Sequence, residues 1–512
     1  MPTSLARQIT RNTIFNFAGR FWSMILGLLL TPFIVAKLGM TGYALWSLVL
    51  IITNYLLTWD LGLGNALVRH VAHYHARQDY NGLNAVMSTA LLLYAVLAVG
   101  AITLTVVLRP VVLSAFRVPL EQWDEVGWVL VMAVVTFALD RVLGIFRSLV
   151  TGLQHMHLTN LIIALGATLN ALGTVVFLQL GYGLKGLALN EILTMVLTTG
   201  LSVVAALRVF PMLRLNPLLL RRKTVTMLLN FGLKVQITSL GAVISLQMNK
   251  LLIGYFLNLN LLAAYELGFK VVYSLISLLR LLSSAVMPAA AELHAQDSHD
   301  LLQQLYRKGS KYLVFVVAPL GFITILYAHS ITTVWLGVPP PEVARVIQFL
   351  MCAYGFNLLT TMGTAMARGV GHPEFETRYA VLVIGSNLLL DVVLVPILGL
   401  DGLLVATLVA VVLGSLYFLA QWHHFLHQTW QTLWHKLYGP PLWACLLATV
   451  PSYLARQGLL AYLPAGRLAH LATGLGGGLV FVSLYVVFTW RSGCWDAQDR
   501  ALCRAILKWS SQ

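Results

Sequence analysis

Long apolar segments recur along this chain, and they constrain its fold more than any other feature. A helix needs about 20 predominantly apolar residues to cross the roughly 30 Å hydrocarbon core of a bilayer. Strands of a transmembrane barrel would instead alternate polar and apolar side chains over about 10 residues. The sequence therefore predicts an all-α polytopic membrane protein. The segments number about 14 and lie at 13–36, 43–64, 84–108, 126–146, 159–180, 184–207, 228–256, 261–285, 311–336, 343–366, 377–399, 402–420, 440–462 and 466–490.

The composition agrees with a chain dissolved in lipid. Its 512 residues are 59% hydrophobic and 10% charged, whereas soluble domains are about half apolar and about a quarter charged. This excludes a soluble enzyme, a secreted disulfide scaffold and a disordered chain. The four cysteines form no CxxC pair, so neither a disulfide framework nor a metal site is expected. The first segment carries Arg20 and lacks a cleavage site, which predicts a retained helix and not a signal peptide.

The net charge of +15 reflects 33 Lys and Arg against 18 Asp and Glu. With a cytoplasmic N-terminus, about 20 of the basic residues fall in cytoplasmic loops, about 7 outside and about 6 within spans. This asymmetry predicts that both termini are cytoplasmic. Because topology accounts for most of the surplus, no nucleic-acid partner is expected.

Two sequence patterns that occur in both halves of the chain indicate an internal duplication. The first and seventh segments share a pattern made by Asn16, Arg20, Gly27 and Thr31 and, at a constant offset, by Asn230, Lys234, Gly241 and Ser245. In the second repeated pattern, Gly152 is followed by Asn170 in the first half and Gly371 by Asn387 in the second half. A short Gly-rich turn follows each asparagine.

Two equal halves with an even number of spans form a parallel repeat about an axis along the membrane normal, as in many transporters. We therefore expect a V-shaped pair of six-helix lobes with the substrate site at the repeat interface. The predicted domains are an N-terminal lobe, a basic cytoplasmic linker, a C-terminal lobe, an amphipathic loop with two extra helices, and a cytoplasmic tail, at 1–207, 208–227, 228–420, 421–490 and 491–512.

Each repeat carries one intramembrane cation on a stripe of small and polar residues. Arg20 and Lys234 hold matched positions, and buried cations in membrane helices normally face a cavity or the bundle interior. Snorkelling to the headgroups is the alternative for both. Two facing cations suit a pyrophosphate. The predicted substrate-binding residues are Arg20, Lys234, Asn16, Asn230, Thr31, Ser245, Asn249, Arg280 and Lys270.

Intramembrane acids are the candidates for coupling to a proton or sodium gradient, and no other cofactor is expected. They are Asp60, Glu191, Glu266 and Asp391. Glu266 and Lys270 are four residues apart on one helix and are equally suited to pairing with each other. The GxGxxG match at 181–186 lies in a turn between two spans and lacks the βαβ context of a dinucleotide site.

The stretch from Asn16 to Ala72 resembles the polysaccharide transport (O-antigen flippase, Wzx-like) family of the multidrug/oligosaccharidyl-lipid/polysaccharide flippase superfamily. The motifs that carry the resemblance are Thr31-Pro32-Phe33-Ile34, Leu38-Gly39, Gly42-Tyr43-Ala44-Leu45-Trp46-Ser47-Leu48, Asp60-Leu61-Gly62-Leu63-Gly64 and Ala66-Leu67-Val68-Arg69. The resemblance implies a non-enzymatic bacterial inner-membrane flippase for an undecaprenyl-pyrophosphate-linked oligosaccharide. A polymerase or other glycan-assembly proteins are the candidate protein partners, and the sequence leaves open whether the protein works with them.

Three alternatives remain open at the level of sequence. A drug or cation antiporter of the same superfamily would need acidic residues in the cavity. A lipid-linked peptidoglycan-precursor flippase would share the mechanism. A membrane glycosyltransferase or polymerase would need a large external loop with a carboxylate cluster, whereas the external loop at 109–125 offers only Glu121, Asp124 and Glu125.

Overall fold

The computed structural model describes residues 2–56, 60–216, 222–280, 283, 286–463 and 466–495. It leaves out the side chains at 2–18, 20, 56, 231, 234, 235, 237–246, 432 and 436. Helices form nearly all of the described chain, and no strand occurs in those ranges. The all-α prediction is therefore confirmed. Residue contacts divide the chain into two compact units, Met1–Ala263 and Ala264–Gln512.

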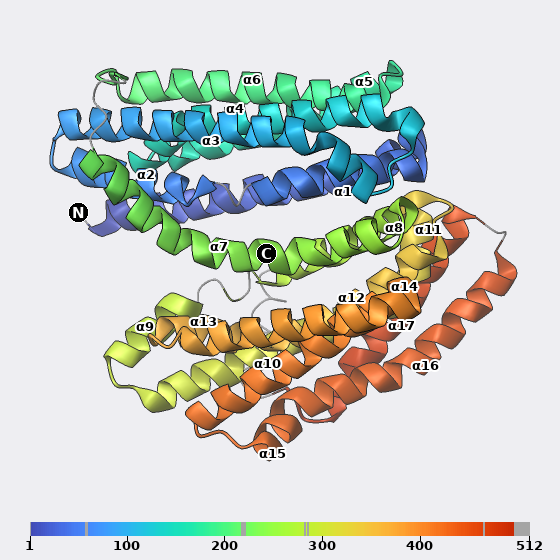
Figure 1. The fold of residues 1–512 in the computed structure, drawn as a ribbon. Coiled ribbons are helices and arrows are strands. Elements are labelled where there is room, and N and C mark those ends of the chain that lie inside the picture. The colour runs from blue at the N-terminus through green and yellow to red at the C-terminus, as the bar shows by residue number, and fades with distance from the viewer. Residues whose placement is uncertain are drawn as a thin grey trace, which may run out of the picture. The chain divides into compact units, whose positions relative to one another are not determined.

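Unit 1 is a bundle in which α4 packs against both α3 and α6, and α5 packs against α1 and α6 (Figure 1). Its helices are α1 Pro2–Leu56, α2 Leu63–Ala76, α3 Tyr80–Ala115, the short η2 Leu120–Gln122, α4 Trp123–Gly152, α5 Met156–Gln179, α6 Gly183–Val209 and α7 Arg222–Phe256, followed by the first residues of α8 Leu259–Arg280.

Unit 2 continues from α8 and pairs α12 with α10 and α14, and α16 with α17. Its remaining helices are α9 Val286–Ala295, α10 His299–Leu326, α11 Ala328–Leu336, α12 Pro341–Leu359, α13 Thr361–Gly369, α14 Glu374–Phe425, α15 Trp430–Leu433, η5 Trp434–Tyr438, α16 Gly439–Tyr462 and α17 Arg467–Arg491.

The described helices account for the predicted spans. Ten of them are long and apolar enough to cross a membrane. Two of these cover two predicted segments each, because α1 and α14 continue through Gly39 and Gly399, where φ is 70° and 60°. Glycine tolerates this left-handed conformation, so the helix direction changes there without a loop. With α7 and α16 added, all the predicted segments have a helix. The protein is a multi-pass membrane protein.

The core of unit 1 forms where α2 inserts between α3, α4 and α7. The side chains of Leu67, Met87 and Leu149 are fully buried there. Residues that follow α6 are hydrogen-bonded to Asn84 of α3. The Asn84 side-chain amide donates to the Met212 carbonyl at 3.1 Å, and its side-chain oxygen accepts from the Arg214 N–H at 3.0 Å. Part of the predicted linker 208–227, the residues 210–216, is therefore held against α3 by hydrogen bonds.

In unit 2 a separate apolar core joins α10 to the last two membrane helices. It includes the buried residues Val314 of α10, Cys445 and Ala448 of α16, and Phe481 of α17. The predicted extra pair, α16 and α17, thus packs directly against the second unit. The boundary between the two units falls within α8, so α7 belongs to unit 1. The lobe boundary at 208–227, which is inferred from the internal repeat, stays a prediction.

Candidate functional site

The two repeat-matched cations lie on helices of unit 1. Arg20 and Asn16 are on α1 and Lys234 and Ser245 are on α7, but their side chains lie outside the described residues. The backbones of α1 and α7 pack against each other. Asn230 of α7 is exposed, which leaves its amide available at this end of the helix.

Two other predicted substrate residues of unit 1 are buried. Thr31 is fully buried, and its hydroxyl donates to the Gly27 carbonyl of the preceding turn at 2.6 Å. Asn249, near the other end of α7, is 5% exposed. In this conformation both groups therefore face protein.

A first polar cluster joins the turn before α2 to α3 and α4. The Tyr94 hydroxyl donates to the Asp60 carboxylate. Nearby on α4, Arg147 donates to both oxygens of Asp140 at 3.0 and 3.1 Å. Arg141 lies 3.7 Å from Asp140 and over the ring of Phe137. The ion-coupling candidate Asp60 therefore has a hydrogen-bond donor and sits among compensating charges.

A second cluster joins α5 to α6 and contains the candidate Glu191. The Asn170 amide donates to the Glu191 carboxylate at 3.1 Å. The Asn190 amide donates to the Asn170 carbonyl at 2.8 Å and to the Thr174 hydroxyl at 3.1 Å. Gly173 permits this contact, because a Cβ there would lie 1.8 Å from the Asn190 side-chain oxygen.

Unit 2 holds the counterpart of this cluster within the kinked helix α14. The Asn387 amide donates to the Thr407 hydroxyl at 3.4 Å, across the same sequence separation as the contact of Asn190 with the Asn170 carbonyl. One turn after Asn387 lies Asp391, which is 1% exposed, and neither of its carboxylate oxygens has a hydrogen-bond partner among the described residues. A buried carboxylate without a donor favours a bound cation or a proton.

Arg280, at the end of α8, belongs to the second polar cluster of unit 2. Its guanidinium donates to the Asn357 side-chain oxygen of α12 at 2.9 Å. The Asn357 amide in turn donates to the Tyr379 hydroxyl of α14. Tyr354 and Tyr273 lie close to this group, and Tyr273 is 41% exposed. Arg280 itself is exposed, and no ion pair involves it within the described part of the chain.

Sequence reasoning missed Asn357 and Tyr379. They lie 77 and 22 residues from their partners in the chain, so only the fold brings them together. Their signal in the sequence is weak, since a single asparagine and a tyrosine in apolar helices are common. Lys270 and Glu266 are half-buried on α8, and their mutual pairing stays a prediction.

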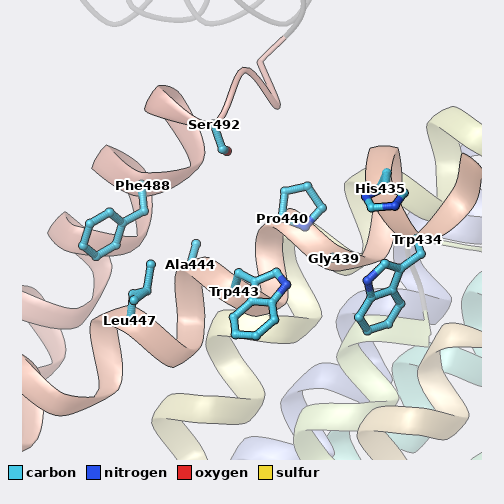
Figure 2. Close-up of a pocket in the computed structure, with 9 residues that line it drawn as sticks. All are labelled: Trp434, His435, Gly439, Pro440, Trp443, Ala444, Leu447, Phe488 and Ser492. Carbon is cyan, nitrogen blue, oxygen red and sulfur yellow. The ribbon is translucent and has the colours of Figure 1, made fainter. Parts of the chain in front are cut away.

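An apolar pocket of about 340 Å³ lies between η5, α16 and α17. Figure 2 shows Phe488 and Leu447 on one side of the pocket and Trp434 on the other, with Trp443 between them. Both tryptophans are substantially exposed. Because its lining contains no Lys, Arg, Asp or Glu, this pocket lacks the charges expected for a headgroup site.

Comparison with known proteins decides the family. A family model described as polysaccharide biosynthesis protein matches residues 25–339, more than half of the chain. The chain belongs to the polysaccharide biosynthesis protein family. This confirms the resemblance found in the stretch from Asn16 to Ala72.

Two proteins with similar sequences are distant from this chain. An uncharacterized membrane protein of Methanocaldococcus jannaschii is 22% identical over 385 residues, which cover 72% of this chain and 76% of that protein. The "Probable flippase AglR" of Haloferax volcanii is 21% identical over 420 residues, covering 80% of this chain and 82% of that one.

Solved structures show that the fold of this polysaccharide biosynthesis protein is shared more widely. The lipid II flippase MurJ in an inward closed conformation matches with a TM-score of 0.71 at 14% identity, over 94% of this chain and 99% of that one. An inward-facing multidrug resistance MATE family transporter of the MOP superfamily matches with a TM-score of 0.64 at 17% identity, over 81% of this chain and 94% of that one. At these identities the likeness concerns the fold alone.

Proposed function

We propose that this protein is a flippase that moves an undecaprenyl-pyrophosphate-linked oligosaccharide from the cytoplasmic to the periplasmic leaflet of a bacterial inner membrane. Membership in the polysaccharide biosynthesis protein family supports the proposal. The observation that carries it is Arg280, an exposed residue whose guanidinium Nη2 donates to the Asn357 side-chain oxygen at 2.9 Å. A fixed guanidinium recognises phosphate oxygens better than a mobile point charge does.

In this mechanism Arg280 binds the pyrophosphate together with the repeat-matched cations Arg20 and Lys234, helped by Asn16 and Asn230. Asn357 orients Arg280 and is itself oriented by Tyr379. The glycan occupies a wet cavity while the polyprenyl tail stays in lipid. Rocking of one lobe against the other exposes the headgroup to the opposite leaflet, as in other parallel-repeat transporters. The cycle forms and breaks no covalent bond, so the protein acts as a transporter without enzymatic activity.

Asp391 is the strongest of the ion-coupling candidates. Asp60 and Glu191 each accept a hydrogen bond from a neighbouring side chain, whereas the Asp391 oxygens have no donor among the described residues. An isolated buried carboxylate is costly unless a proton or a cation neutralises it. Uptake and release of H⁺ or Na⁺ at Asp391 would therefore couple an ion gradient to the rocking of the lobes.

The experiment is complementation of a strain that lacks its own O-antigen or capsule flippase. Wild-type protein should restore surface polysaccharide, and the Arg20→Ala/Lys234→Ala variant should lose it while reaching the membrane at normal levels. Full export by that variant would refute the proposed cation pair. Export restored only when a glycosyltransferase or polymerase gene accompanies this one would place the protein within a larger assembly.

Two related transporters are the alternatives. The fold is shared with a lipid II flippase and with multidrug transporters, and Asp391 is an acidic residue of the kind a cation antiporter requires. Extrusion of a cationic dye driven by a H⁺ or Na⁺ gradient would favour the antiporter. Rescue of a strain depleted of its peptidoglycan-precursor flippase would favour the lipid II substrate.

A further inference from the structure

A group of cationic and hydroxyl side chains lies in unit 2 along α17, which packs against both α11 and α16 (Figure 1). The rings of His329 and His470 are 5.6 Å apart. The Ser330 hydroxyl lies 3.5 Å from Nδ1 of His470. Arg456 reaches into the same group from α16, with its guanidinium carbon 6.0 Å from the ring centre of Tyr327. None of these five side chains is acidic.

Arg456 is the anchor of the group. It is 9% exposed, and its Nε has no hydrogen-bond partner. Within the residues that the structure describes, its guanidinium makes no hydrogen bond and no ion pair, and it lies over the face of the Tyr327 ring. The Tyr327 hydroxyl is already engaged by the Ser452 hydroxyl at 2.6 Å. A buried cation without a counter-charge is strongly unfavourable, so a ligand from outside the chain is expected to compensate it.

The start of α17 supplies further donors beside His470, which lies in its first turn. The helix begins at Arg467, and the preceding Gly466 provides no side-chain cap, so the first N–H groups of the helix have no partner within it. The positive end of the helix dipole favours an anion at this position. Arg467 is exposed and its guanidinium lies against Gly337, where a Cβ would come within 2.3 Å of it.

The depth of the group matches a lipid headgroup. Arg456 lies six residues before α16 ends at Tyr462, which places it about 9 Å from the helix end at ~1.5 Å per residue. Lipid phosphates occupy this boundary between hydrocarbon and water. A water molecule would satisfy Nε but would leave the charge of Arg456 uncompensated, whereas a phosphate satisfies both requirements.

We propose that Arg456, Arg467, His470 and the first N–H groups of α17 form a binding site for the phosphate of an anionic phospholipid. Arg456 of α16 can donate two N–H bonds to phosphate oxygens. Arg467, whose guanidinium lies against Gly337, adds positive charge at the first residue of α17. His329 and Ser330 border the site. The bound lipid holds α11, α16 and α17 together at this end of unit 2, independently of the substrate that the protein moves. Free phosphate has the same chemistry and is the other source of the ligand.

The test uses the full-length protein in detergent after its lipids have been removed. Native mass spectrometry would measure the binding of dioleoyl phosphatidylglycerol, of zwitterionic dioleoyl phosphatidylcholine, and of inorganic phosphate. We expect saturable binding of phosphatidylglycerol that weakens at least about tenfold in Arg456→Gln, which corresponds to the loss of a charge-assisted hydrogen bond. Arg345→Gln is the matched control, because Arg345 is an exposed arginine of the same unit that pairs with Asp401 at 2.8 Å.

Competition by millimolar inorganic phosphate, with the same dependence on Arg456, would support the phosphate site and assign free phosphate as its ligand. Equal binding of the two lipids, or binding that is unchanged in Arg456→Gln, would overturn the proposal. If Arg456→Gln does not fold, the double variant Arg467→Gln/His470→Gln changes two less buried positions and should weaken phosphatidylglycerol binding several-fold. Unchanged binding in that folded variant would also overturn the proposal.

Discussion

Gly62 and Gly232 bring the start of α2 into direct backbone contact with α7. A Cβ on Gly62 would lie 2.2 Å from the Gly232 carbonyl oxygen, and a Cβ on Gly232 would lie 2.3 Å from the Leu61 carbonyl oxygen. Gly62 also has a φ of 67°. Two small residues, far apart in sequence, therefore fix α7 against the core of unit 1, close to the position of Lys234.

A Cβ at position 62 would overlap the backbone of α7, and an alanine there would have a strained positive φ. Gly62→Ala should therefore destabilise the protein by about 2–3 kcal/mol. The measurement is the midpoint of thermal unfolding of the purified protein. Gly100→Ala is the control, since nothing lies within 4 Å of a Cβ there. In a helix interior that change should be neutral or stabilising by about 0.5–1 kcal/mol. Equal midpoints for the two variants would refute the tight contact.

Arg280→Gln should reduce polysaccharide export at least about tenfold, because it removes the charge that binds phosphate oxygens. Asn357→Ala should cause a smaller loss, since Arg280 keeps its charge but loses the hydrogen bond that orients it. Both would be measured as surface polysaccharide per cell at matched membrane protein levels. Arg368→Gln, which alters an exposed arginine paired with Glu376 in the same unit, should leave export unchanged.

Asp391→Asn should reduce transport without lowering the stability of the protein. The amide carries no charge to bury, so the thermal unfolding midpoint should stay the same or rise. Export driven by an ion gradient should fall by at least about tenfold if this carboxylate takes up the coupling ion. The measurement pairs thermal unfolding with export in the complemented strain. Wild-type export in Asp391→Asn would remove Asp391 from the coupling mechanism.

His70 of α2, which lies outside the ten membrane-length helices, predicts a pH effect. Burial, together with the charges of Arg69 and His73, holds the pKa of His70 below its ordinary value. The unfolded chain then takes up this proton at a higher pH than the native protein, so stability should fall as the pH drops below about 6.5. His70→Gln should show a smaller fall in the unfolding midpoint between pH 7.5 and pH 5.5, at the chosen buffer conditions of about 0.15 M salt. An identical pH profile would contradict this role.

Hydropathy alone located every membrane helix, because each span must be apolar over a fixed length. It did not reveal that α1 and α14 pass through Gly39 and Gly399 without a break, since a single glycine reads as a turn. It also does not predict α2 and α9, which lie largely between the apolar segments, because such short helices depend on tertiary packing for their stability. The repeated pattern that contains Asn170 and Asn387 is visible in the sequence. In the structure each of these residues takes part in a hydrogen-bonded polar cluster.

The candidate site was harder to predict for a physical reason. The charge of Arg280 is visible in the sequence, but its environment depends on Asn357 and Tyr379, which only the fold brings near. The same holds for Asp391, whose distinguishing property is the absence of a donor among the described residues around it. The resemblance at Asp60 to Arg69 pointed to the family, while the roles of single residues depend on partners that sequence spacing does not encode.

The most direct test of the central claim is translocation in proteoliposomes that contain the purified protein and a fluorescent undecaprenyl-pyrophosphate-linked oligosaccharide. A membrane-impermeant reductant added outside would report how fast labelled headgroups cross the bilayer. We predict rapid crossing with the wild-type protein and crossing at the rate of protein-free liposomes with Arg20→Ala/Lys234→Ala/Arg280→Gln. Crossing by the wild-type protein no faster than in protein-free liposomes, under an imposed H⁺ or Na⁺ gradient of either direction, would contradict the account.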